Sequence, residues 1–104
     1  MPHDKTKLTA AELQTFLSKH AGWSNTSDGI RRTFEFPDFT VAMAFVNRVA
    51  DAANAADHHP DIDIRYSKVT LTLITHDAGG LTSRDTRLAA QADAFHRADG
   101  QPKA

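Results

Sequence analysis

The sequence predicts an α+β fold in which three helices pack on one face of a four-stranded, largely antiparallel sheet. Three segments repeat apolar residues at helical spacing, and four shorter segments alternate apolar and polar residues as strands do. The strands come in two adjacent pairs joined by short turns, which is how antiparallel neighbours are connected. The resulting order is α-β-β-α-β-β-α. The 104 residues predict one domain over residues 1–104, with an ordered core from about 8 to 98.

Short polar motifs mark where each helix is expected to begin. Thr9 and Glu12 fit a capping box, in which each side chain satisfies a free amide of the other residue. Asp38 is a good cap for the second helix, and Thr82 for the third. The expected helices cover residues 9–21, 39–57 and 83–98.

The four strands are predicted from their alternation of apolar and polar residues. Asp28-Gly29 suits the turn of the first hairpin, and a tight turn near Ser67-Lys68 joins the second pair. We expect Trp23 and Tyr66 to lie in the core. The expected strands are residues 23–27, 30–36, 61–66 and 68–75.

Composition and charge exclude several classes of function. The formal charge is -1 and no stretch is strongly basic, so a phosphate-binding surface for nucleic acid is not expected. No apolar run approaches the roughly 20 residues that span a bilayer. We therefore expect a cytoplasmic protein that binds neither nucleic acid nor membranes. A core this small, with an open sheet edge, favours pairing with a second subunit.

The chemistry of this chain is expected to come from its six histidines, because it has no cysteine. His58 and His59 follow the second helix, and His76 closes the last strand. Asp85 lies in the first turn of the last helix, on its inward-facing stripe. Imidazole exchanges protons near neutral pH, so three of them beside a carboxylate suit general acid–base catalysis.

Simpler interpretations remain open for these residues. Adjacent histidines without i, i+4 spacing grip a zinc ion poorly, so no metal is expected. Asp85 can serve only as the capping partner of Thr82. We expect packing or surface roles for His20 and His96, an inert place in a frayed end for His3, and a solvated pair rather than an anion site for Arg31 and Arg32.

Four separated motifs in this chain resemble the pterin-4a-carbinolamine dehydratase family. They occur in the family's order and spacing, and the resemblance covers about residues 8–97. The motifs are DHHPDIDIRY at 57–66, THDAGGLT at 75–82 followed by Asp85, Gly22-Trp23 with I-x-R-x-F-x-F at 30–36, and F-x-x-A-M-x-F at 39–45.

The resemblance implies a hydro-lyase with the fold described above. The reaction removes water from 4a-hydroxytetrahydrobiopterin, or a related pterin, and gives the quinonoid dihydropterin, which recycles tetrahydrobiopterin after aromatic amino acid hydroxylation. Members form dimers by extending the sheet, and some form tetramers. Some relatives act as a dimerisation cofactor of a transcription factor or influence hydroxylase expression, so a regulatory module without required catalysis is the alternative.

The resemblance also assigns roles to particular residues. His58 and His76 are implied as acid and base, with His59 binding the pterin and sharing proton transfer. Asp85 is implied to orient or stabilise one imidazole. No metal or organic cofactor is implied, because the carbinolamine nitrogen itself expels the hydroxyl. Residues implied to contact the pterin are Asp57, Pro60, Tyr66, Thr75 and Asp77.

Two positions depart from the family's pattern. Asn54 stands four residues before His58, where the family usually carries a charged residue, often Glu. The departure bears on substrate orientation or on the titration of the histidines. Ile62 replaces a Trp found in some animal members, which concerns packing more than chemistry.

Overall fold

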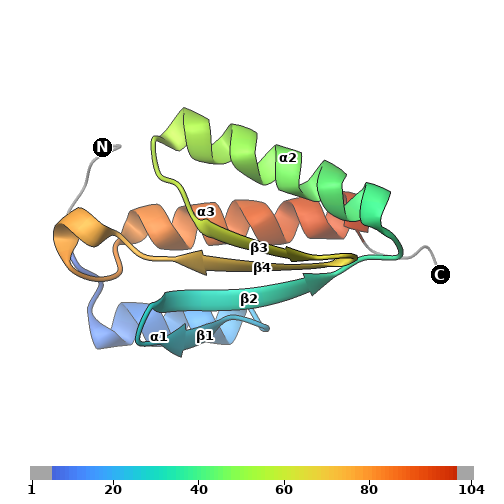
Figure 1. The fold of residues 1–104 in the computed structure, drawn as a ribbon. Coiled ribbons are helices and arrows are strands. Elements are labelled where there is room, and N and C mark those ends of the chain that lie inside the picture. The colour runs from blue at the N-terminus through green and yellow to red at the C-terminus, as the bar shows by residue number, and fades with distance from the viewer. Residues whose placement is uncertain (1–5, 101–104) are drawn as a thin grey trace.

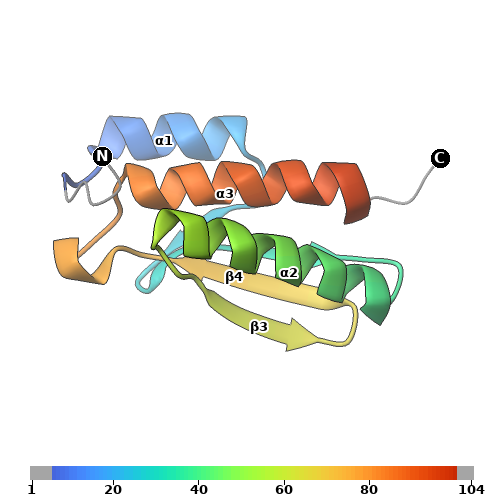
Figure 2. The same ribbon diagram turned by 90° about the horizontal axis from the view of Figure 1, so that it is seen from above.

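Helices and strands follow the predicted order in the computed structural model, which describes residues 6–100. The strands form a single antiparallel sheet with the spatial order β1-β2-β4-β3. All three helices cover one face of it (Figure 1, Figure 2). The elements are α1 (Ala10–Lys19), β1 (Ser24–Thr26), β2 (Gly29–Glu35), α2 (Phe39–Ala56), β3 (Asp61–Arg65), β4 (Lys68–Leu73) and α3 (Ser83–Phe95).

The three predicted helix caps are all formed. Thr9 and Glu12 bond reciprocally at the start of α1, and Thr82 and Asp85 do the same at the start of α3. The Asp38 carboxylate accepts from the backbone N–H of Val41 at 2.9 Å, which caps α2. Each cap satisfies amides that have no partner within the helix.

The core lies between the helices and the covered face of the sheet. Strand β4 is central in its hydrogen bonding, because β2 and β3 pair with it on either side. The fully buried side chains of this layer include Ile30, Phe34, Val69, Leu71 and Leu73 from the sheet and Phe45, Val49 and Leu88 from the helices.

The edge strand β3 is more exposed than its apolar alternation suggested. Ile62 pairs with Leu71 and Ile64 with Val69, so both isoleucines face the helical side as expected. They remain 36% and 39% exposed, because a strand at the edge has a neighbour on one side only. The expectation that Tyr66 is a core residue is wrong, since its side chain is 70% exposed, whereas Trp23 is buried as predicted.

Several boundaries differ from the prediction by one to three residues. The first hairpin turns at Ser27-Asp28, and Gly29 already belongs to β2. The segment after β4, expected to be a loop, contains a short 3-10 helix, η1 (His76–Ala78). α3 ends at Phe95 and continues into a π-helical turn, η2 (His96–Gly100). His3 lies outside the described residues.

Within residues 6–100, no helix has both the length and the apolar character needed to cross a bilayer.

Candidate active site

A buried histidine–carboxylate pair lies where α2, β4 and α3 approach one another. Nε2 of His58 is 2.6 Å from Oδ1 of Asp85. His58 is 6% exposed and Asp85 is fully buried. A carboxylate oxygen only accepts, so Nε2–H of His58 donates and Nδ1 is the acceptor nitrogen of the neutral ring. The sequence placed Asp85 beside one of the histidines without saying which, and the structure shows that its partner is His58.

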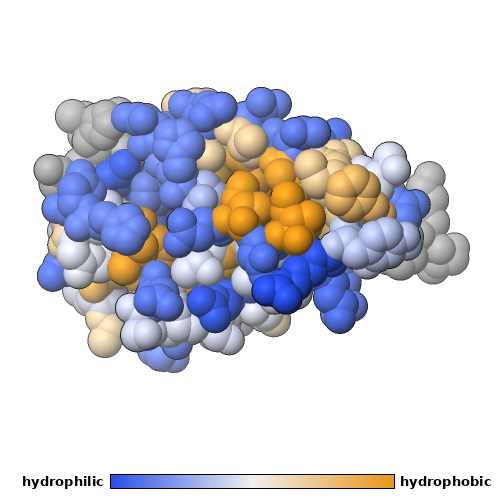
Figure 3. Space-filling model, viewed as in Figure 1, coloured by the Kyte–Doolittle hydropathy of each residue, from blue (hydrophilic) through white to orange (hydrophobic). Residues whose placement is uncertain are grey.

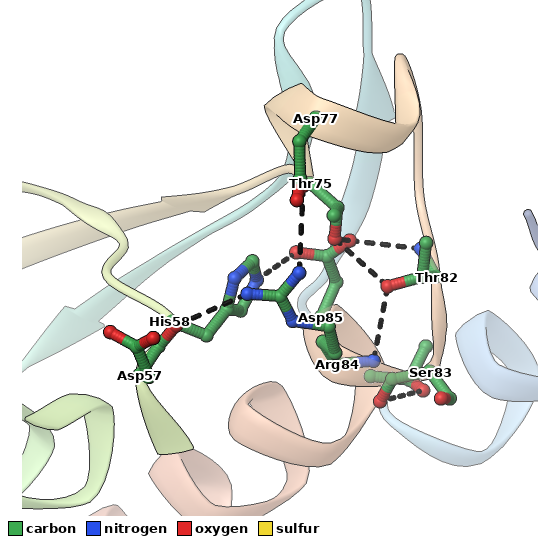
Figure 4. A network of polar contacts seen from close by, with 9 residues as sticks. Asp57, His58, Thr75, Asp77, Thr82, Ser83, Arg84 and Asp85 are labelled. Atoms are coloured by element: carbon green, nitrogen blue, oxygen red, sulfur yellow. Dashed lines mark hydrogen bonds and ion pairs between the residues drawn. The ribbon is translucent and has the colours of Figure 1, made fainter. Parts of the chain in front are cut away.

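The second oxygen of Asp85 is held by two further donors. Oδ2 accepts from the Thr75 hydroxyl at 2.8 Å and from the Thr82 backbone N–H at 2.9 Å. The two threonine hydroxyls also bond each other at 2.8 Å (Figure 4). Asp85 therefore caps α3 and bonds His58 at once, so its capping role does not exclude a role beside an imidazole.

The end of α2 brings His58 to this carboxylate. Asp57 ends the helix in the left-handed conformation, with φ 51° and ψ 45°. A left-handed residue is a common helix terminator and turns the chain sharply. The backbone N–H of His58 still bonds the carbonyl of Ala53 at 3.0 Å, which fixes the position of His58 relative to the helix. Pro60 then prevents the helix from resuming.

His59 is exposed and contacts the residue that departs from the family's pattern, Asn54. Its Nε2 lies 2.9 Å from Oδ1 of Asn54, and both side chains are exposed. Because the amide oxygen accepts, Nε2–H of His59 donates to it and Nδ1 carries the lone pair. Asn54 is thus a neutral partner for His59, at a position where a carboxylate would favour the charged imidazole.

His76 lies in η1, next in the chain to Thr75 of the Asp85 network. Its side chain is exposed and lines a concavity of ≈ 710 Å³ on the face of the sheet that the helices leave open. The other lining residues are Ser27, Asp28, Arg31, Thr33, Asp61, Asp63, Thr70, Thr72 and Ile74. His76 therefore faces solvent, whereas His58 is enclosed.

The remaining residues implied by the resemblance divide into near and distant ones. Thr75 bonds Asp85 directly, and Asp57 and Pro60 flank the two adjacent histidines. Asp77 follows His76 in η1. Tyr66 lies beyond the other end of β3, about 20 Å from Pro60 at the ordinary strand rise. Its ring stacks on Phe39 at 6.4 Å between centroids.

Arg84, the residue that precedes Asp85 in α3, also belongs to the site and was not predicted from the sequence. Its side chain is only 9% exposed. NH2 donates to the backbone carbonyl of Asp57 at 3.1 Å, and NH1 lies 3.5 Å from Oδ1 of Asp77. Neither contact has a local signal, because each joins segments that are separate in the sequence.

A second buried carboxylate, Asp93 of α3, was also missed. It is 3% exposed and accepts from Nε1 of Trp23 at 2.9 Å, Nδ1 of His20 at 3.0 Å and NH1 of Arg32 at 2.8 Å. The expected solvated pair of Arg31 and Arg32 is therefore wrong, since Arg32 serves this cluster. The sequence contained one signal for the burial of Arg32, because this arginine shares one face of β2 with apolar residues.

His20 and His96 have packing roles, as predicted. The His20 ring stacks on Phe16 at 4.5 Å between centroids. His96 meets Phe34 and Phe36 edge to face at 5.2 and 5.3 Å. Among residues 6–100, no three His, Asp or Glu side chains gather in a way that could hold a metal ion.

Fold and site together define a small α+β domain with a buried His–Asp pair at one end of its sheet. Comparison with known proteins shows the family to which this domain belongs. The sequence model of the family described as pterin 4 alpha carbinolamine dehydratase matches residues 6–95. A protein of Koribacter versatilis with a provisional pterin-4-alpha-carbinolamine dehydratase name is 54% identical over 89 residues, which are 86% of this chain and 95% of that protein.

Two further comparisons agree with this placement. A protein of a Roseiflexus species with the same provisional name is 54% identical over 88 residues, covering 85% of this chain and 95% of the relative. The crystal structure of a transcriptional coactivator/pterin dehydratase from Brucella melitensis superimposes with a TM-score of 0.82 at 34% identity, covering 86% of this chain and 98% of that one. The chain belongs to the pterin 4 alpha carbinolamine dehydratase family, whose members are hydro-lyases.

Proposed function

We propose that this chain acts in the cytoplasm as a dehydratase that converts 4a-hydroxytetrahydrobiopterin, or a related 4a-carbinolamine pterin, to the quinonoid dihydropterin. The reaction would recycle tetrahydrobiopterin. The observation that carries the proposal is the 2.6 Å contact between His58 and the fully buried Asp85, within the motifs that resemble the family.

The proposed chemistry breaks one C–O bond and moves two protons. The C4a–O bond breaks as the leaving hydroxyl takes a proton, and water departs. The adjacent N5 loses its proton, and its electrons form the new C=N bond. An acid and a base of near-neutral titration suit both steps. Because the substrate nitrogen drives the expulsion, the proposal includes no metal and no organic cofactor.

Histidines supply the acid and the base in this proposal. His58 and His76 exchange the two protons, and His59 binds the pterin and shares in proton transfer. Asp85 fixes the tautomer of His58 and stabilises its charged form, as carboxylates do for catalytic imidazoles. Asp57, Pro60, Tyr66, Thr75 and Asp77 are the proposed substrate-binding residues. Thr75 would act mainly through Asp85, because its hydroxyl already bonds that carboxylate.

A coupled assay with freshly generated 4a-hydroxytetrahydropterin tests the proposal. The wild type is expected to accelerate the dehydration, and His58→Ala and His76→Ala are each expected to lower kcat by about 10²-fold or more. His20→Gln, whose ring stacks on Phe16 outside the site, is the matched control and should keep wild-type kcat. Equal rates for the wild type and both alanine variants would defeat the proposal.

A homodimer formed through β3 belongs to the same proposal. Among the residues that the structure describes, the exposed large apolar side chains are Phe39, Ile62, Ile64 and Tyr66. Figure 3 shows a hydrophobic patch beside α2 and β3. An exposed, apolar edge strand is a template for pairing with another strand, here β3 of a second copy.

Sedimentation equilibrium tests this assembly and separates a dimer from a tetramer. The wild type is expected to be at least dimeric. Ile64→Lys should shift it to a folded monomer, whereas Asn25→Lys on the opposite edge strand should not. A wild-type monomer, or an Ile64→Lys variant that still self-associates, argues against pairing through β3.

A regulatory role is the second candidate, because the similar Brucella melitensis protein is described as both a transcriptional coactivator and a pterin dehydratase. The exposed apolar patch offers a surface for such a partner. The two functions separate in a variant lacking His58 and His76. If that variant retains the cellular effect of the wild type while dehydration is lost, regulation is the function that matters.

A further inference from the structure

The guanidinium of Arg84 lies between the two chain segments that carry the buried and the exposed histidine. Figure 4 shows it reaching from the first turn of α3 toward Asp57 and Asp77. NH2 donates to the Asp57 carbonyl at 3.1 Å, and NH1 lies 3.5 Å from the Asp77 carboxylate. The next residue after Asp57 is His58, and the residue before Asp77 is His76.

This arginine is held in a way that a surface arginine is not. Its side chain is 9% exposed, and its Nε is buried without a hydrogen-bond partner. A buried donor without a partner opposes folding, so solubility or a simple surface ion pair does not account for the arrangement. Arg87, one turn further along α3, shows the ordinary case. It is exposed, and its NH2 lies 3.5 Å from the Ser83 hydroxyl.

Arg84 contacts the chain at two places where its direction changes. Asp57 has the left-handed conformation, which is uncommon for a residue other than glycine. Asp77 belongs to a 3-10 helix of three residues that has no side-chain cap. A guanidinium is a rigid planar fork, so one side chain can bond both segments in a fixed geometry, which a lysine cannot do.

We propose that Arg84 is a positioning residue that sets the place of His76 relative to His58. Asp85 orients the His58 ring, while the neighbouring Arg84 fixes the backbone just before His58 and the turn just after His76. The inference rests on the proposed function, in which these two histidines are the acid and the base. A displacement of about 1 Å between reacting groups can cost about 10²-fold in rate.

Steady-state kinetics on the full chain tests this role. Arg84→Gln is expected to lower kcat at least tenfold with a smaller change in KM, and Arg84→Lys should recover only part of the loss. Asp77→Asn should lower kcat less, and the double variant Arg84→Gln/Asp77→Asn should be no slower than Arg84→Gln alone. Arg87→Gln is the matched control. An Arg84→Gln variant with wild-type kcat per folded molecule, or fully additive effects of the two substitutions, overturns the proposal.

Nuclear magnetic resonance of the histidine rings provides a readout that does not depend on turnover. Arg84→Gln should shift the ring signals of His58 and His76 and leave those of His20 and His96 unchanged. If the wild type fails to dehydrate the pterin, the proposed function fails, yet these shifts still test whether the contacts of Arg84 with Asp57 and Asp77 position the two histidines. If all four rings keep their wild-type signals, Arg84 does not position the histidines. Should Arg84→Gln not fold, Arg84→Lys and Asp77→Asn give the same comparison.

Discussion

Replacing Asp85 by Asn is expected to invert the tautomer of His58 while leaving the fold in place. Two buried donors, the Thr75 hydroxyl and the Thr82 N–H, point at one oxygen of Asp85. Asparagine has a single acceptor oxygen. If that oxygen faced His58, its NH2 would oppose the Thr82 N–H and leave a buried donor without a partner, at a cost of about 1–3 kcal/mol. The oxygen therefore faces the threonines, and the NH2 faces His58.

An amide NH2 at that position forces Nε2 of His58 to accept, so the ring proton moves to Nδ1. General acid–base groups typically contribute about 10²–10⁴ in rate. We expect Asp85→Asn to lower kcat in the coupled dehydration assay by that factor, about 3–5 kcal/mol in the activation barrier. The nitrogen-15 chemical shifts of the His58 ring should show the exchanged tautomer independently of activity.

Asp93→Asn is the matched control, because it neutralises a second buried carboxylate on the same helix. Its partners are Trp23, His20 and Arg32, none of which is proposed to act on the substrate. It should lower stability and keep kcat per folded molecule. The reasoning is refuted if Asp85→Asn keeps kcat within about threefold of the wild type, or if Asp93→Asn loses as much activity.

Three further predictions concern positions whose surroundings the structure defines. Asn54→Glu places a carboxylate beside Nε2 of His59, so the NMR signals of that ring should shift. Unchanged signals would show that the two side chains do not meet in solution. Leu71→Ala removes a fully buried side chain from β4 and should lower the free energy of unfolding in urea by about 2–5 kcal/mol. Ile62 pairs with Leu71 but is partly exposed, so Ile62→Ala should lower that free energy by less than half as much. Gly29→Ala should lower the free energy of unfolding by at least about 1–3 kcal/mol, because φ is 124° at Gly29 and an added Cβ would collide with a backbone carbonyl of β4. A variant as stable as the wild type in the same urea titration contradicts that expectation.

Local signals in the sequence were sufficient for the order of elements and for part of the site. Thr9, Asp38 and Thr82 act within three or four residues of themselves, so their capping roles can be read from short motifs. The placing of Asp85 on the inward stripe of α3 followed from helical spacing alone. Its meeting with His58 could be anticipated only as a shared site, because 27 residues separate the two.

The errors arise where tertiary neighbours decide the outcome. Alternation identified the apolar face of β3, yet it could not show that this strand lies at the edge with Ile62 and Ile64 half covered. Arg32 looked like a surface residue from its charge. Its ion-pair partner, Asp93, lies 61 residues away on another element, and no local motif predicts such a pair.

The two buried carboxylates of α3 have a consequence for how the molecule opens. Asp85 and Asp93 are eight residues apart, about 12 Å along the helix axis. Asp85 bonds His58 and Thr75, and so ties the first turn of α3 to the segments that follow α2 and β4. Asp93 bonds His20 and Arg32, and so ties the last turn of α3 to the end of α1 and to β2. Fraying from either end would expose a carboxylate together with its partners. We therefore expect the amide hydrogens of α3 to exchange with solvent only on global unfolding, as measured by hydrogen–deuterium exchange.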